Sequence, residues 1–178
     1  MNRKQLILET SLELFAKNGV VGTTTKSIAN EAGVSEGLLF RHYQSKEGLV
    51  KALKKLAADK VRILAQEIID LTEPKDILRL TILSLTRIPF EDYALWKLIL
   101  GIKFQSELAD ESFADVIEDK VTKAFKGLRF AHAEMEAELL LNSLNGMLLA
   151  MLLNKQYKIE PLLNLMLKKY QLNKRNLN

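Results

Sequence analysis

Apolar residues recur at helical spacing along almost the whole chain. Near the N-terminus, a helix that ends at Asn18-Gly19 carries its apolar face at Leu6, Ile7, Thr10, Leu14 and Phe15. The same kind of pattern predicts further helices over residues 25–32, 35–43, 45–71, 74–86, 91–108, 113–130, 133–154 and 161–170. No pattern typical of a β-hairpin occurs. The sequence therefore predicts an all-α fold with about nine helices.

Residues 1–46 have the features of a helix-turn-helix domain with three helices. Thr23-Thr24, Ser35 and Ser45 stand where they can cap the starts of helices. Gly33 allows the positive φ of a tight turn, and two helices joined by such a turn form a helix-turn-helix. The buried faces are predicted at Ile28, Ala29, Ala32, Leu39 and Tyr43. Residues 47–178 are predicted to form a separate helical bundle.

The charge of the chain changes this picture, because it is unevenly distributed. The net charge of the 178 residues is +4, and residues 1–60 hold ten Lys and Arg against six Asp and Glu, whereas residues 61–178 hold sixteen of each sign. An excess at one end is expected where that end faces a polyanion. The groove-facing side of the second motif helix would then carry Glu36, Gly37, Phe40 and Arg41, flanked by Leu38. An ordinary helical corner in a bundle remains an alternative.

Other features exclude several classes of protein. The chain has no cysteine, which excludes disulfides and cysteine zinc sites. The apolar run 139–153 contains polar residues and is shorter than the roughly 20 residues that cross a membrane. No secretory signal pattern begins the sequence. We therefore expect a cytoplasmic protein without a membrane partner.

The spacing of one long motif resembles a known family. It comprises Thr23-Thr24, Ile28-Ala29, Ala32-Gly33-Val34-Ser35, Gly37, Leu39-Phe40, His42-Tyr43, Ser45-Lys46-Glu47 and Leu49. Residues 4–50 thereby resemble the DNA-binding domain of the TetR family of bacterial transcriptional regulators. The resemblance implies that the second motif helix lies in the major groove of DNA, with phosphate contacts near Thr24, His42 and Lys46. It also implies a homodimer that binds a small-molecule inducer.

The expected DNA-binding residues combine the motif with its neighbouring charges: Thr24, Lys26, Ser35, Glu36, Gly37, Leu38, Phe40, Arg41, His42 and Lys46. Three of them depart from the family pattern. Phe40 replaces a usual tyrosine, Leu38 a common small polar residue, and Glu36 a common basic or amide residue. Glu36 either accepts a hydrogen bond from cytosine N4 or only stabilises the positive end of its helix.

The predicted dimer interface lies on the long apolar helix and the last helix, at Leu140, Leu144, Met147, Leu148, Met151, Leu163 and Met166. One small subunit can hardly cover so much apolar surface, although a fully buried helix in a monomer is the alternative. An aromatic stripe predicts an apolar ligand site at Phe90, Tyr93, Trp96, Leu100 and Phe104. Such a stripe is more often part of an ordinary core, which is the alternative.

The alternatives to a DNA-binding regulator are a helical enzyme and an adaptor. His132 and Glu136, at i and i+4, are the best candidates for a metal site, but a surface cluster explains them better. No phosphate loop or nucleophile motif occurs, so we expect neither an enzyme nor a metal or other cofactor. An adaptor of the same fold that has lost DNA binding remains the alternative function.

The sequence thus predicts a homodimeric DNA-binding transcriptional regulator. It would bind a roughly palindromic operator in double-stranded DNA, because each subunit contributes one recognition helix. The expected mode is a repressor that releases the operator when it binds a small apolar or amphipathic effector.

Overall fold

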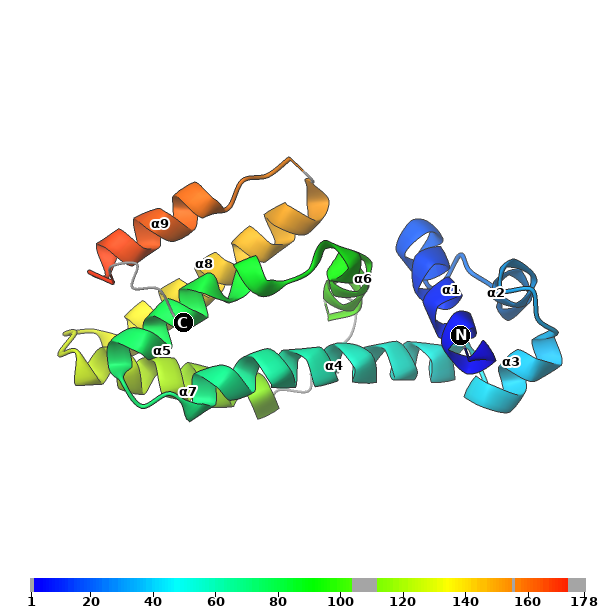
Figure 1. Cartoon of the computed structure of the whole chain (residues 1–178), viewed down its shortest axis with the longest axis horizontal. Helices are drawn as coiled ribbons and strands as arrows, with labels where there is room; N and C mark the ends of the chain where they lie inside the picture. Colours follow the sequence, from blue (N-terminus) through cyan, green and yellow to red (C-terminus); the bar gives the residue numbers. More distant parts are fainter. Residues whose placement is uncertain (1, 104–111, 155, 173–178) are drawn as a thin grey trace. The chain divides into compact units, whose positions relative to one another are not determined.

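The computed structural model describes residues 2–103, 112–154 and 156–172, and the regular secondary structure within them is all helical (Figure 1). The all-α prediction is confirmed. The elements, in order, are α1 (Arg3–Asn18), α2 (Thr25–Glu31), α3 (Glu36–Tyr43), α4 (Lys46–Asp70), α5 (Pro74–Leu83), the 3-10 helices η1 (Ser84–Arg87) and η2 (Phe90–Asp92), α6 (Tyr93–Lys103), α7 (Ser112–Gly127), α8 (Ala133–Leu153) and α9 (Glu160–Lys169).

Most helix ends lie within two or three residues of the predicted positions. α5 is the main exception, because it stops at Leu83 and continues as the 3-10 helix η1, whereas periodicity extended it to residue 86. The apolar pattern alone does not distinguish the two kinds of helix. The predicted end of the sixth helix at residue 108 lies outside the described residues.

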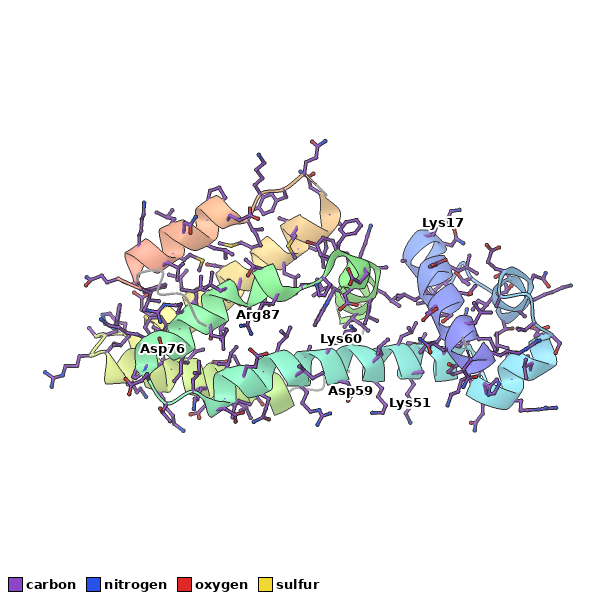
Figure 2. The ribbon with its side chains drawn as sticks, in the orientation of Figure 1. Lys17, Lys51, Asp59, Lys60, Asp76 and Arg87 are labelled. Atoms are coloured by element: carbon purple, nitrogen blue, oxygen red, sulfur yellow. The ribbon has the colours of Figure 1, made fainter. Side chains whose placement is uncertain are left out.

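The helices form two compact units, of which the first comprises Met1–Lys60 and Phe90–Glu107. Its core is built by α1, α2, α3, the first part of α4 and α6, and contains Ile7, Phe15, Ile28, Leu39, Leu49, Leu53, Leu95 and Leu98. Lys60, which is labelled in Figure 2, lies on α4 and forms an ion pair with Asp92 of η2, with 2.7 Å between Nζ and Oδ2. The motif helices therefore rest on a core larger than the motif itself.

The second unit comprises Val61–Pro89 and Leu108–Asn178. In it α7 packs against both α5 and α8, and α9 packs against α5. Phe125 is fully buried and lies edge-on to Phe130 and Tyr170, with ring centroids 5.1 Å away in each pair. The units divide within α4, and the functional boundary expected after residue 46 stays a prediction, since a packing unit and a functional domain need not coincide.

α8 is long and apolar enough to cross a membrane by length and composition alone. The core helix of a globular protein satisfies the same criterion. In the second unit α8 packs on α7 and buries one face, at Ala133, Ala137, Leu140, Leu144, Leu148, Met151 and Leu152. Burial of this face favours a core helix.

Candidate nucleic-acid interface

The two helices of the motif begin at side-chain caps. Thr24 Oγ1 accepts a hydrogen bond from the backbone N–H of Ser27 at 3.1 Å, and Ser27 Oγ accepts one from the N–H of Thr24 at 3.2 Å. Ser35 Oγ accepts from the N–H of Leu38 at 3.2 Å. These bonds satisfy N–H groups that a helix start otherwise leaves unpaired. The predicted caps at Thr24 and Ser35 are confirmed, and they fix where α2 and α3 begin.

The turn between α2 and α3 depends on Gly33. Its φ of +62° lies in the left-handed region, where side chains with a Cβ are strained. The next residue, Val34, donates its N–H to the carbonyl of Ala29 at 3.0 Å. This turn sets the angle between the two helices, as a helix-turn-helix requires.

The inner face of α3 is anchored in the core of the first unit. Leu39 is fully buried and Tyr43 is nearly so. The hydroxyl of Tyr43 donates a hydrogen bond to the carbonyl of Lys4 at 2.7 Å, which ties the end of α3 to the start of α1. Burial raises the pKa of Tyr43. This phenol therefore stays protonated and keeps donating at neutral pH.

A close approach between α3 and α4 explains a glycine that sequence reasoning did not single out. A Cβ placed on Gly48 would lie 1.8 Å from the backbone oxygen of Tyr43. The oxygen belongs to the backbone at the end of α3, so it cannot move aside as a flexible side chain would. The glycine in the sequence Lys46-Glu47-Gly48 was the available signal. Gly48 thus holds the first turn of α4 against the recognition helix.

The opposite face of α3 points to solvent, as the sequence predicted. Gly37, Arg41 and Phe40 are exposed, with Phe40 at 43%. Leu38, His42 and Glu36 are half-buried. Arg41 and the exposed Lys26 on α2 make no hydrogen bond or ion pair within the described part of the chain. Both are available for an anionic partner.

The structure gives Lys46 a role that its sequence position did not indicate. Its Nζ donates hydrogen bonds to the carbonyls of Val20 at 2.9 Å and Thr23 at 3.2 Å. These bonds connect the start of α4 to the turn before α2. An ammonium group has three N–H donors, so one remains for an external acceptor. The phosphate contact of Lys46 stays a prediction. In addition, Lys46 stabilises the motif by joining α4 to the turn before α2, which we call its bracing role.

A shallow concavity adds basic residues that were not predicted as part of the site. It measures about 340 Å³ and is lined by Lys4, His42, Tyr43, Gln44, Gly48, Lys51, Ala52 and Lys55. Figure 2 labels Lys51 on α4. The i, i+4 spacing of Lys51 and Lys55 would have placed them on one helix face. His42 thus stands beside three lysines from two helices.

The residues expected to bind an effector are only partly brought together. Phe90 is 62% exposed and packs its ring 5.1 Å from that of Tyr93. Trp96 and Leu100 are half-buried on α6, while the core-facing residues of this helix are Leu95 and Leu98. Phe104 lies outside the described residues. None of the other four lines the described concavity.

The residues expected at the dimer interface differ in how far their own subunit buries them, and their role at an interface stays a prediction. Leu140, Leu144, Leu148, Met151 and Leu163 are buried within the second unit, whereas Met147 and Met166 are half-buried. A buried side chain already packs inside its own subunit. The large apolar residues that α8 and α9 leave exposed are Met135, Leu139, Leu153, Leu162 and Leu165. Helical periodicity shows that a helix is apolar all round but not which side its own subunit covers.

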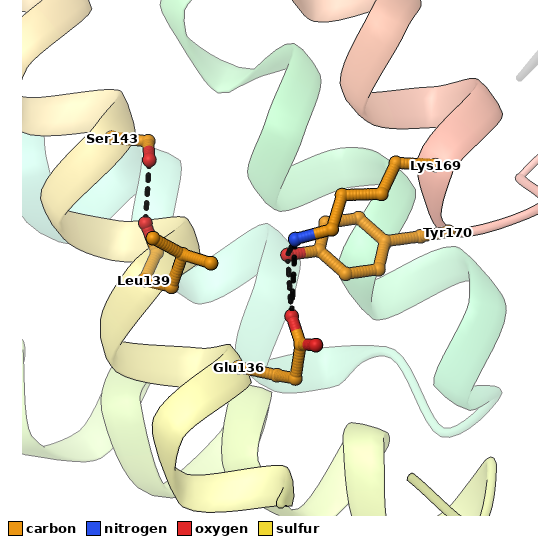
Figure 3. A network of polar contacts seen from close by, with 5 residues as sticks. All are labelled: Glu136, Leu139, Ser143, Lys169 and Tyr170. Carbon is orange, nitrogen blue, oxygen red and sulfur yellow. Dashed lines mark hydrogen bonds and ion pairs between the residues drawn. The ribbon is translucent and has the colours of Figure 1, made fainter.

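The polar residues near the start of α8 have a structural role. Tyr170 donates its hydroxyl proton to Glu136 Oε2 at 2.9 Å, and Lys169 Nζ lies 3.3 Å from the same oxygen (Figure 3). The carboxylate of Glu136, which the sequence suggested as a possible metal ligand, is therefore already bonded to two side chains. Within the described residues no three His, Cys, Asp or Glu side chains form a group suited to a metal ion.

An all-helical fold whose first unit is a capped helix-turn-helix with an exposed recognition face defines a helix-turn-helix protein. The model of the family "Bacterial regulatory proteins, tetR family" matches residues 7–53. The N-terminal domain of this chain belongs to that family. The match covers α2 and α3 completely, together with most of α1 and the start of α4.

Proteins of similar sequence match the N-terminal region, whereas solved structures match the fold of most of the chain. The uncharacterized HTH-type transcriptional regulator YvkB of Bacillus subtilis (strain 168) is 49% identical over 47 residues, which cover 26% of this chain and 25% of that protein. The chain thus matches only about a quarter of the length of this relative. A transcriptional regulator from Saccharomonospora viridis, solved with choline, superposes with a TM-score of 0.72 at 19% identity, covering 93% of this chain and 95% of that one.

A second solved structure shows the same fold. AibR, in complex with isovaleryl coenzyme A and operator DNA, superposes with a TM-score of 0.61 at 23% identity. The alignment covers 93% of this chain and 96% of that one. The two superpositions show that the fold shared with these structures covers most of the chain, including helices of both units.

Proposed function

We propose that this protein is a sequence-specific DNA-binding transcriptional regulator. The proposal rests on one observation: α3 buries one face in the core and exposes the opposite face to solvent. Its inner face is locked into the core at Leu39 and Tyr43, while Gly37, Phe40 and Arg41 face solvent on a rigid support. A helix presented in this way can enter the major groove of B-DNA, with its N-terminal residues at the base edges.

Basic groups around α3 support contacts to the phosphate backbone. Lys26 and Arg41 are exposed, and Lys46 keeps one N–H donor beyond its two intramolecular bonds. His42 can donate to a phosphate oxygen from a neutral ring. Lys4, Lys51 and Lys55 extend this basic region along α1 and α4. Such contacts supply affinity and register, whereas α3 supplies sequence choice.

The proposed assembly is a homodimer formed through α8 and α9. Met135, Leu139 and Leu153 recur at whole-turn spacing on α8 with exposures of 69%, 52% and 64%, and Leu165 on α9 is 62% exposed. Apolar side chains exposed to this degree on two helices favour a protein partner. A second copy of the chain offers the same residues to a two-fold interface. Two recognition helices then require a roughly palindromic operator.

Trp96 supports a small-molecule effector. Its indole Nε1–H is buried and has no hydrogen-bond partner among the described residues. Buried donors in folded proteins are nearly always paired, so an acceptor atom of an effector would stabilise this group. We therefore propose an apolar or amphipathic effector with an oxygen acceptor. Because Trp96 is the only tryptophan, its fluorescence would report binding directly.

The proposed mode of action is repression in the cytoplasm, where a dimer seated on its operator excludes other DNA-binding proteins. Effector binding would release the operator by favouring a conformation in which the two recognition helices no longer fit it. The alternative is an adaptor that has lost DNA binding. Its supporting features are the unusual Glu36 and Leu38 on the recognition face.

Selection of bound duplexes from a random pool tests the proposal, followed by affinity measurements on the selected duplex over a range of salt concentrations. A sequence-specific dimer gives a palindromic motif, and its affinity falls steeply with salt because bound phosphates release counterions. An adaptor gives no motif and only weak binding that disappears at moderate salt. The second result would overturn the proposal.

A further inference from the structure

The carboxylate of Glu36, on the first turn of the recognition helix, is held by a residue of the preceding helix. Thr25, the first residue of α2, donates a hydrogen bond from Oγ1 to Glu36 Oε1 at 2.6 Å. Both side chains are half-buried. The bond fixes a side chain that would otherwise sample several rotamers, and it joins the two helices of the motif.

The same bond leaves most of the acceptor capacity of Glu36 unused. An ionised carboxylate has about four lone-pair positions on its two oxygens. Within the described residues, Thr25 is the only side chain that bonds to Glu36, and no lysine or arginine forms an ion pair with it. The negative charge is therefore not neutralised inside the protein.

Glu36 lies in the first turn of α3, the end that would meet base edges if α3 enters the major groove as proposed. Ser35 caps this end, and the neighbouring Gly37 has no heavy atom within 4 Å of the place where a Cβ would stand. A base pair can therefore approach this turn closely. A carboxylate close to DNA repels phosphate, so its presence costs affinity unless a base donates to it.

Only two bases present a hydrogen-bond donor in the major groove. Adenine offers N6–H beside the acceptor N7, and N7 repels a carboxylate. Cytosine offers N4–H without an adjacent acceptor on the same base. A fixed carboxylate that can only accept hydrogen bonds thus matches cytosine better than any other base.

We propose that Glu36 is a specificity-determining residue that selects cytosine in each half-site, and that Thr25 is the positioning residue that holds its carboxylate. This inference rests on the proposed DNA-binding function and adds to it the base that the leading edge of α3 selects. The carboxylate of Glu36 lowers the affinity for DNA in general, because it repels phosphate, and it raises the preference for duplexes with cytosine at this position.

The test starts from the duplex selected by the wild-type protein. The affinity for this duplex is compared with that for duplexes in which each base pair of the half-site is changed in turn, at one fixed salt concentration. We expect one C·G pair whose replacement lowers wild-type affinity about tenfold, the scale of one lost base contact. In Glu36→Ala this ratio falls to about one, while the ratios at the other positions keep their values.

Two further variants separate readout from folding. Glu36→Gln keeps an acceptor for Thr25 but adds an N–H donor, so its preference should move from cytosine to a base with an acceptor in the groove. Thr25→Val removes the hydroxyl at similar shape and should weaken discrimination at the same base pair only. Thr25→Ser retains the hydroxyl and should retain discrimination. Thermal unfolding of each variant tests whether the fold is kept.

Two results would overturn the inference, and they differ from failure of the proposed function. If Glu36→Ala tightens binding equally on every duplex with unchanged base preferences, Glu36 only repels phosphate. If Glu36→Gln selects the same half-site as the wild type, the carboxylate does not read a base. If the wild-type protein selects no motif at all, the DNA-binding function itself is wrong.

Discussion

Gly48 and Gly37 lie eleven positions apart, on α4 and α3, and the structure gives them opposite roles. At Gly48 a Cβ would collide with the backbone of Tyr43, whereas at Gly37 the space is open. Substitution by alanine therefore tests the close packing of α3 and α4 at Gly48 and the open space at Gly37.

We expect Gly48→Ala to lower the free energy of unfolding by about 2 kcal/mol or more, because the clash forces α3 and α4 apart. Gly37→Ala should raise it by roughly 0.5–1 kcal/mol, since alanine is the better helix former. Denaturant unfolding of both variants measures these changes. Equal stability of the two variants would show that the approach of Gly48 to Tyr43 is not tight in solution.

Lys46 combines a bracing role with the expected phosphate contact, and these can be measured separately. Lys46→Ala removes the hydrogen bonds to the carbonyls of Val20 and Thr23, so we expect a lower melting temperature. If its remaining N–H also binds a phosphate, the slope of log affinity against log salt falls in magnitude by about one.

Lys26→Ala is the matched control for this prediction, because Lys26 is exposed and bonds to no described residue. It should change the salt slope and leave the melting temperature unchanged. A Lys46→Ala variant with lower stability and an unchanged salt slope would assign Lys46 to bracing alone.

α9 is joined to α8 by a polar contact that depends on pH. Burial raises the pKa of Tyr170, and the hydrogen bond to Tyr170 raises the pKa of Lys169. Both groups hold their protons more tightly in the folded than in the unfolded protein. Their contribution to stability is complete below the unfolded pKa values near 10, and it is lost as pH rises through the folded values.

We therefore expect the melting temperature to fall above about pH 10. Tyr43, whose pKa burial also raises, adds to this fall from the first unit. In Tyr170→Phe the fall should be shallower, and the stability at neutral pH should be lower by about 1 kcal/mol, because Glu136 loses a donor. Tyr157→Phe removes a phenol without a hydrogen bond among the described residues and serves as the control. Parallel pH curves for wild type and Tyr170→Phe would contradict the expectation.

The oligomeric state depends on the whole molecule. If the exposed apolar residues of α8 and α9 form the dimer interface, Leu139→Lys together with Leu165→Lys should give a monomer in sedimentation velocity. Operator affinity should then fall by about 100-fold or more, because the two recognition helices no longer bind as a linked pair.

Ile63→Lys is the control for this loss, since Ile63 is also 62% exposed but lies on α4. It should leave both the mass and the operator affinity unchanged. A dimer that persists in the Leu139, Leu165 double variant would exclude this interface.

The sequence alone determined the local structure of the motif. Thr24 and Ser35 were identified as caps and Gly33 as the turn residue, because capping and positive φ depend on a few neighbouring atoms. The buried face of α3 followed from spacing, since Leu39 and Tyr43 lie one helical turn apart. The unbroken motif also indicated the family to which the N-terminal domain belongs.

Only the tertiary structure decided which side of an apolar helix its own subunit covers. Leu140 and Leu139 are neighbours in the sequence, yet the first is fully buried and the second is half exposed. Likewise, the contacts of Lys46 with Val20 and of Glu36 with Thr25 join residues that no sequence spacing relates. Such contacts depend on how the elements pack, and periodicity, which records only the faces of a single helix, does not contain that information.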